Sequence, residues 1–196
     1  CGTFAFDYQS IYSPSGLNPD YTGVMGLNNF DDSWGIWGHN LRKVLGDNVD
    51  KVYATIHGKT DDSQLCFSSE EMYRQIESYI VDNIGEKGSS RFVIAPDDTP
   101  YACTCASCTA MGNTEKNATP AVTELLLRLS QRFPKHSFFT ISYLSTKQVT
   151  DKQLPSNAGI IVSAIDFPLR RIDGKNAQEK KFMQQLNQWK KVTKNI

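Results

Sequence analysis

Apolar residues recur with the spacing of an α-helix in three long segments of the chain. The segment 68–84 begins with a capping box formed by Ser68 and Glu71, and the pattern ends at Gly85. Its apolar residues recur at every fourth position: Met72, Ile76, Ile80 and Ile84. This spacing predicts a helix that buries one face against the rest of the fold.

Two further helices are predicted from the same periodicity. The segment 119–134 has Thr119 in the position of a helix cap and Pro120 in the first turn. Its apolar face consists of Val122, Leu125, Leu126, Leu129 and Phe133. The segment 176–192 carries a shorter apolar stripe that we expect to be buried, made of Phe182, Met183, Leu186 and Trp189.

Short apolar runs predict six β-strands, at residues 4–8, 23–29, 34–40, 91–96, 136–143 and 158–165. From residue 64 onward these runs alternate with the helices, which favours a parallel sheet covered by helices. The last residues, 190–196, are typical of the beginning of another strand. A complete barrel takes about 250 residues, so this chain has room for about six of the eight strands. We therefore expect one α/β domain, residues 1–196 of a longer protein, built as an incomplete (β/α) TIM-type barrel, with an open sheet as the alternative.

The charge and composition exclude several classes of function. The chain has 21 basic and 21 acidic residues, without a basic stripe or a Gly-rich phosphate loop, so nucleic acid is not an expected partner. No run approaches the roughly 20 apolar residues of a transmembrane segment. Cys1 matches either the lipid-bearing cysteine of a processed bacterial lipoprotein or a trimmed boundary.

The order of several motifs resembles a known family. These motifs are "WGIWGHN", "SQLCFSS" before a helix, "APDDTPYACTCASC", a helix ending "RFP", "ISY" and "AGIIVSAI". The order is similar to that of a bacterial glycoside-hydrolase-like barrel family, catalogued as domain of unknown function 4838. The resemblance implies a carbohydrate-active protein exported by bacteria: periplasmic, bound to the cell surface as a lipoprotein, or secreted. Asp97 and the pair Thr99-Pro100 depart from the family pattern of Pro-Asn-Asp followed by a Gly-rich turn.

Four cysteines are candidates for a structural metal site. Cys103, Cys105 and Cys108 fall within six positions, and Cys66 is the candidate for a fourth ligand. Bound zinc would hold the loop that carries Asp97 and Asp98 in place. Disulfides, which suit an exported protein, and small buried thiols are the alternatives. A thioredoxin-like pair is not expected, because no helix is predicted directly after "CASC".

Polar and aromatic side chains stand at the ends of the predicted strands, where the loops of a parallel barrel converge. We expect this face to bind sugar hydroxyls and the flat C–H faces of sugar rings. The candidate substrate contacts are Trp37, His39, Asn40, Asp97 and Tyr143.

Glycosidic hydrolysis commonly needs one protonated and one ionised carboxyl group. Asp98 is the candidate acid, and the charge of its neighbour Asp97 is expected to favour its protonated form. Asp166 or Asp7 is the candidate second carboxylate. These assignments predict a glycoside hydrolase-like protein. A non-catalytic glycan-binding module on the same barrel is the alternative, and a zinc-dependent hydrolase is a weaker one because catalytic zinc usually has His or Glu ligands.

Overall fold

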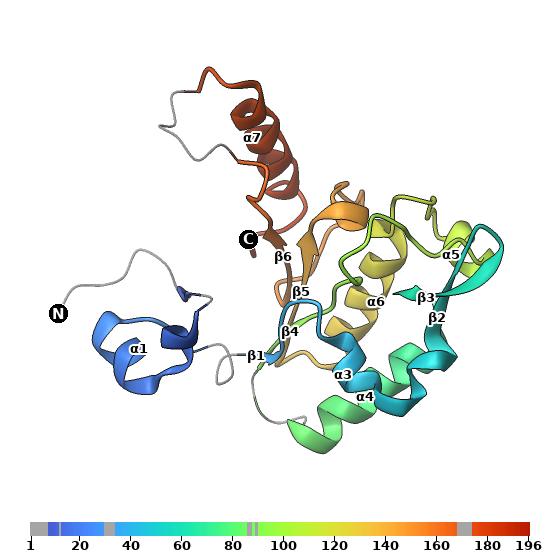
Figure 1. Cartoon of the computed structure of the whole chain (residues 1–196), viewed down its shortest axis with the longest axis horizontal. Helices are drawn as coiled ribbons and strands as arrows, with labels where there is room; N and C mark the ends of the chain where they lie inside the picture. The colour runs from blue at the N-terminus through green and yellow to red at the C-terminus, as the bar shows by residue number, and fades with distance from the viewer. Residues whose placement is uncertain (1–7, 12, 30–33, 86–87, 89, 168–173) are drawn as a thin grey trace.

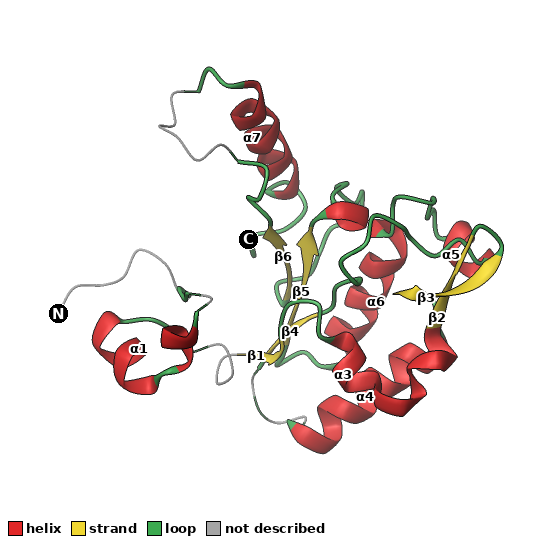
Figure 2. Ribbon diagram, viewed as in Figure 1, coloured by secondary structure: helices red, strands yellow, loops and turns green. Residues whose placement is uncertain are grey.

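The centre of the protein is a four-stranded parallel sheet (Figures 1 and 2). A computed structural model describes residues 8–11, 13–29, 34–85, 88, 90–167 and 174–196. The sheet has the order β1-β4-β5-β6, and each neighbouring pair is parallel. Its strands are β1 (Trp34–Ile36), β4 (Arg91–Val93), β5 (Ser137–Ser142) and β6 (Ala158–Val162). These four strands confirm the predicted runs at 34–40, 91–96, 136–143 and 158–165.

The helices α4 (Glu70–Asn83) and α6 (Thr119–Arg132) pack against the sheet and form the main core. The predicted apolar face of α4 is confirmed, because Met72, Ile76 and Ile80 are fully buried. The predicted capping box is wrong by one residue. Ser69, not Ser68, accepts the hydrogen bond from the backbone N–H of Met72.

The start of α6 also differs from the prediction. Thr119 is the first helical residue, and Ala118 precedes it without a side-chain cap. The side chain of Asn117 accepts a hydrogen bond from the N–H of Thr119, and Asn113 accepts one from Ala121. Two asparagines therefore satisfy the free backbone N–H groups at this end of the helix.

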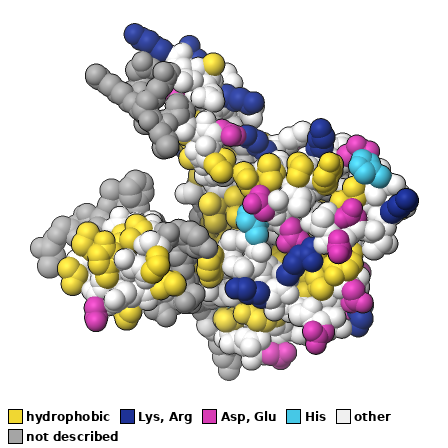
Figure 3. Space-filling view, in the orientation of Figure 1, with side chains coloured by type: hydrophobic (Ala, Val, Ile, Leu, Met, Phe, Trp, Pro, Cys, Tyr) yellow, Lys and Arg dark blue, Asp and Glu magenta, His cyan; other side chains and the backbone are white. Residues whose placement is uncertain are grey.

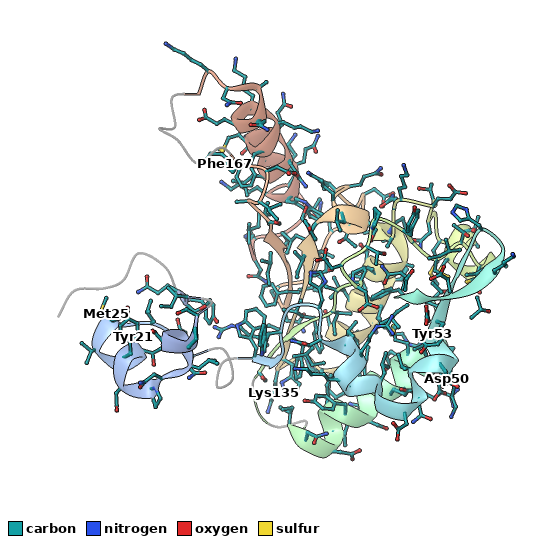
Figure 4. All side chains as sticks on the ribbon, viewed as in Figure 1. Tyr21, Met25, Asp50, Tyr53, Lys135 and Phe167 are labelled. Atoms are coloured by element: carbon teal, nitrogen blue, oxygen red, sulfur yellow. The ribbon has the colours of Figure 1, made fainter. Side chains whose placement is uncertain are left out.

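The predicted strand at 23–29 is wrong, because this region contains α1 (Pro19–Met25) after the short 3-10 helix η1 (Pro14–Leu17). Asn18 caps α1, Pro19 begins it, and Gly26 ends it at a φ of 64°. The helix carries exposed apolar side chains (Figure 3), among them Tyr21 and Met25, which are labelled in Figure 4. The predicted strand at 4–8 lies outside the described residues except for Tyr8.

An antiparallel hairpin was not expected from the sequence. After α3 (Leu41–Leu45) and the 3-10 helix η2 (Gly46–Val52), the strands β2 (Tyr53–Ile56) and β3 (Lys59–Leu65) pair with each other. His57 and Gly58 form the turn, with φ angles of 50° and 77°. The hairpin packs over the segment 97–108, which ends within the short helix α5 (Ala106–Ala110).

The C-terminal helix α7 (Ala177–Trp189) follows β6 and projects beyond the sheet (Figure 1). Trp189 is buried, and its indole N–H donates to Ser142 at the end of β5. Met183 is 45% exposed, so its predicted burial is wrong. Asn195 accepts a backbone hydrogen bond from Ile160 in β6. The chain after α7 therefore passes beside β6, but residues 190–196 form no strand, so the predicted beginning of another strand is wrong.

The sheet is open, so the structure does not form the predicted barrel. Within the described residues, β1 and β6 are the two edge strands of the sheet. On the sheet face opposite Phe138, the side chains of Trp34, Phe139 and Ile161 line a hollow of about 760 Å³. Among the described helices, none has the length and apolar composition needed to cross a membrane.

Candidate active site and sulfur cluster

The ends of β1, β4 and β5 bring predicted site residues together. His39 follows β1, and its Nδ1 lies 2.5 Å from the carbonyl oxygen of Pro96, which follows β4. Because a carbonyl oxygen can only accept a hydrogen bond, Nδ1 carries a proton in this contact and Nε2 is left to face away from it. The ring centroid of His39 lies 6.2 Å from that of Tyr143, which follows β5.

The phenol of Tyr143 interacts with the candidate acid, Asp98. Desolvation raises the pKa of Tyr143, and the charge of Asp98 and a hydrogen bond to it act in the same direction. Asp166 also raises this pKa, while Lys147 opposes the effect. Because such effects fall off with distance, Asp98, Tyr143 and Asp166 share one electrostatic environment.

Asp166, after β6, is paired with a lysine that was not predicted. Its Oδ2 lies 2.5 Å from Nζ of Lys147, and this hydrogen bond is the main cause that lowers the pKa of Asp166. The pair borders a cleft of about 290 Å³ between β6 and α7. The polar side chains that line this cleft are Lys147, Ser163, Asp166, Gln178, Lys181 and Gln185.

The other predicted substrate contacts are engaged within the protein. The carboxylate of Asp97 accepts a hydrogen bond of 2.8 Å from Nε of Arg42 and forms an ion pair with it. This pairing neutralises the charge that was expected to act on Asp98. The side-chain N–H of Asn40 donates to the carbonyl oxygen of Trp37 at 2.7 Å, which closes the turn after β1.

Asp7, the alternative second carboxylate, lies outside the described residues. Among the described candidates, the rings of His39 and Tyr143 lie close together, and the charges of Asp98 and Asp166 both act on Tyr143.

The four candidate cysteines converge beside this site. Cys66 follows β3, Cys103 and Cys105 precede α5, and Cys108 lies in α5. Their four sulfur atoms all lie within 4.8 Å of one another. The Sγ of Cys66 is 3.7 Å from that of Cys105 and 3.8 Å from that of Cys108. Four sulfurs bound to one zinc ion at about 2.3 Å would be about 3.8 Å apart, so the donor set fits a tetrahedral metal.

Backbone and hydroxyl groups surround these sulfurs. The N–H of Thr55 donates to Sγ of Cys103 at 3.2 Å, and the N–H of Cys108 donates to Sγ of Cys105 at 3.5 Å. The thiol of Cys108 donates to Oγ of Ser68 at 3.1 Å. The two backbone N–H donors stabilise negative charge on sulfur, which a set of metal-bound thiolates requires.

Hydrogen bonds within the cluster also separate the pKa values of the thiols. Those from Cys108 and Cys66 lower the pKa of Cys103. The hydrogen bond with Cys103 raises the pKa of Cys66 to about 11 and is the main cause that raises the pKa of Cys108. The directions of these shifts favour the thiolate form of Cys103 over those of Cys66 and Cys108.

The geometry of the four cysteines tests two alternatives to a metal site, namely disulfides and a thioredoxin-like redox pair. All four are free thiols, so the disulfide alternative is wrong for the described cysteines. The argument against a thioredoxin-like pair is also wrong, because α5 begins at Ala106 with Cys105 as its cap. The two sulfurs of the "CASC" motif nevertheless lie close to those of Cys66 and Cys103. A redox pair needs only two sulfurs, whereas four convergent sulfurs are typical of a metal site.

Several residues of the candidate site and the sulfur cluster were not predicted from the sequence. Arg42, Gln64 and Lys147 bind groups far away along the chain, so no local pattern indicates their partners. Ser68 had a local signal, a serine three positions before Glu71, but that signal indicated a cap. The signal that could have found its contact with sulfur is its position two residues after Cys66.

Comparison with known proteins identifies a family for most of the chain. The family described as domain of unknown function (DUF4838) matches residues 40–196. The match includes all four cysteines of the cluster, together with Asp98, Tyr143 and Asp166. Neither a curated protein nor a solved structure matches the chain.

Proposed function

Because the chain belongs to the DUF4838 family, whose description assigns no function, we propose one from the site itself: a glycoside hydrolase-like protein that binds carbohydrate at the carboxyl ends of β1, β4, β5 and β6. The observation that carries this proposal is the convergence of His39, Asp98, Tyr143 and Asp166 from the ends of these strands. In α/β folds with parallel strands, ligands bind at this edge.

The order of the strands supports a barrel-like relationship. Successive parallel strands lie next to one another in chain order, without the reversal that characterises doubly wound sheets. In a barrel, the face with Trp34, Phe139 and Ile161 would be the interior, which side chains fill. We therefore propose that the four strands are a sector of a TIM-type barrel.

The proposed chemistry assigns different roles to the two carboxyl groups. Asp98 protonates the leaving oxygen of the glycosidic bond, and Tyr143 holds its carboxyl group by a hydrogen bond. Asp166 is ionised because Lys147 lowers its pKa, and it stabilises the positive charge that develops on the sugar ring. The Nε2 atom of His39 accepts a hydrogen bond from a sugar hydroxyl, and the indole of Trp37 offers an apolar surface to the ring.

Hydrolysis is tested with the intact chain on a panel of aryl glycosides and polysaccharides. Replacing a general acid typically lowers kcat by about 10²- to 10⁴-fold, so Asp98→Asn is expected to lose activity in this range. Asp82→Asn, which changes an exposed carboxylate on α4, is the matched control and should retain full activity.

The second candidate function is a non-catalytic glycan-binding module. It is favoured by the ion pairs at Asp97 and Asp166, which engage two of the candidate carboxylates within the protein. Binding on a glycan array without product release, unchanged by Asp98→Asn, would support the module and contradict the enzyme.

We also propose that the sulfur cluster binds one structural zinc ion. The support is the donor set: four sulfurs at the spacing of a tetrahedron, with no His or carboxylate among the clustered ligands. Four protein ligands leave no open position, so the ion would brace the loop and not take part in chemistry. In an exported protein, the ion would also protect the thiols from oxidation.

The zinc proposal is tested on protein purified without chelator. Elemental analysis is expected to find one zinc ion per chain, and X-ray absorption should show four sulfur neighbours at about 2.3 Å. Five thiols that react freely in the native protein, one for each cysteine of the sequence, would contradict the proposal.

A further inference from the structure

Asp98 occupies the apex of a very tight turn. The N–H of Thr99 donates to the carbonyl oxygen of Asp97 at 2.7 Å, which closes a γ-turn around Asp98. A γ-turn fixes only three residues with one hydrogen bond, so its conformation depends on what holds its two ends. The direction in which the Asp98 side chain leaves the backbone is set by those ends.

One buried amide, that of Gln64 at the end of β3, holds both ends of this turn. Its Oε1 accepts a hydrogen bond of 3.0 Å from the N–H of Asp97. Its Nε2 lies 3.3 Å from the carbonyl oxygen of Asp97 and 3.2 Å from both Oγ1 of Thr99 and the carbonyl oxygen of Tyr101. The side chain is only 1% exposed, so water does not replace these bonds easily.

The chemistry of this position requires an amide of the length of glutamine. The turn and the carbonyl group of Tyr101 just after it present one N–H donor and three oxygen acceptors to the same side chain. Glutamine offers an acceptor and an NH₂ group in one plane, whereas a carboxylate would face the three oxygens without a hydrogen to donate. A methionine has a similar length and would make none of these bonds.

We propose that Gln64 is a positioning residue for Asp98: by holding both ends of the γ-turn, it directs the Asp98 carboxyl group toward Tyr143. The role in catalysis rests on the proposed function, but the positioning itself does not. Arg42 supports the same turn from the other side, because it holds the carboxylate of Asp97. Because Arg42 holds the side chain of Asp97 and Gln64 holds that of Thr99, Asp98 is the residue of the turn whose side chain faces the carboxyl ends of the strands.

The test uses the ring of Tyr143 as a reporter of where Asp98 lies. The protein is labelled with ¹³C-tyrosine, and the Tyr143 signal is assigned with Tyr143→Phe. Asp98→Asn is expected to lower the pKa of Tyr143, because it removes a neighbouring negative charge. Gln64→Met is expected to cause at least half of that shift, and to cause no further shift when Asp98→Asn is already present.

A matched control separates positioning from general destabilisation. Asn157 makes the same kind of contact at the opposite end of the sheet, where its amide donates to the carbonyl oxygens of Ser130, Phe133 and His136. Asn157→Leu removes these bonds and should leave the titration of Tyr143 unchanged. If Gln64→Met does not fold, Gln64→Leu, which likewise adds no charge, takes its place, with the same expected direction of shift.

An unchanged Tyr143 titration in a folded Gln64 variant would overturn the proposal, and so would an equal shift in Asn157→Leu. The experiment contains no sugar, so its outcome is independent of whether the protein cleaves a glycosidic bond. A positive titration with no activity on any glycoside would leave Gln64 as a positioning residue and refute only the enzyme.

Discussion

Cys66→Ser and Cys105→Ser are expected to lose different shares of the stability that a bound metal confers. Cys66 and Cys103 are 103 − 66 = 37 residues apart, whereas the other three cysteines fall within six positions. For a cross-link that closes a loop of 37 residues, the chain-entropy relation gives about 4 kcal/mol. Without Cys66, the metal would close only short turns and the long loop would stay open.

The quantity to measure is the difference in unfolding free energy between metal-saturated and chelator-treated protein. For the wild type we expect about 4 kcal/mol, or a shift in Tm of about 8–16 °C for a domain of this size. Cys105→Ser keeps the long loop closed through Cys66, Cys103 and Cys108, so it should retain most of this difference. Cys66→Ser should lose most of it. Both positions are partly buried, which makes the two substitutions comparable.

Cys1→Ser is the control, because it removes the remaining cysteine of the chain and leaves the cluster intact. It should show the full wild-type difference. An equal loss in Cys66→Ser and Cys105→Ser would refute the argument from loop closure. A wild-type Tm that does not respond to chelator, in protein without bound metal, would refute the metal site itself.

Three further substitutions test the core, the sheet edge and the ion pair beside the cleft. Phe92→Ala removes a fully buried ring stacked on another aromatic ring, and should lower the unfolding free energy by about 3–5 kcal/mol in urea. Gly159→Ala would place a Cβ atom 2.5 Å from the carbonyl oxygen of Asn195, so it should cost about 1–3 kcal/mol and increase hydrogen exchange at Ile160. Lys147→Met should raise the pKa of Asp166 toward its ordinary value, measured by NMR. Because the pKa of Asp166 is lowered in the folded state, its stabilising effect is present above the unfolded value of about 3.9 and is lost as the pH falls through the folded value. This acid-dependent part should disappear in Lys147→Met.

The parts of the fold that the sequence predicts well are those with a local apolar pattern. Helix α4 is an example, because Met72, Ile76 and Ile80 repeat at helical spacing and all three are buried. The hairpin has no such pattern. Its second strand reads "KTDDSQL", and only its last two residues are buried. A strand that is polar over most of its length is specified by the turn at His57-Gly58 and by its partner strand, which periodicity alone does not reveal.

The site shows the same division between local and distant information. Strand ends can be found from the sequence, which is why His39, Asp98, Tyr143 and Asp166 were candidates. Their partners could not be found in this way, because Gln64 reaches a turn 33 residues away and Arg42 reaches Asp97 across 55 residues. The capping error has a related cause. Two adjacent serines offered a cap, and only tertiary contact assigns Ser68 to the sulfurs and Ser69 to the helix.

The β2–β3 hairpin holds residues that contact both the turn around Asp98 and the sulfur cluster. Gln64 lies in the last part of β3 and Cys66 directly follows the strand, so the two residues are separated by one position and both reach the segment 97–108. In an extended chain, residues at this spacing point to the same side. A shift of one residue in the pairing of β2 with β3 would turn both side chains away together. The position of the hairpin therefore determines both the turn around Asp98 and the geometry of the sulfur cluster. A variant that shifts the pairing of β2 with β3 is expected to perturb both, whereas a variant that changes only one side chain is expected to perturb only the feature which that side chain contacts.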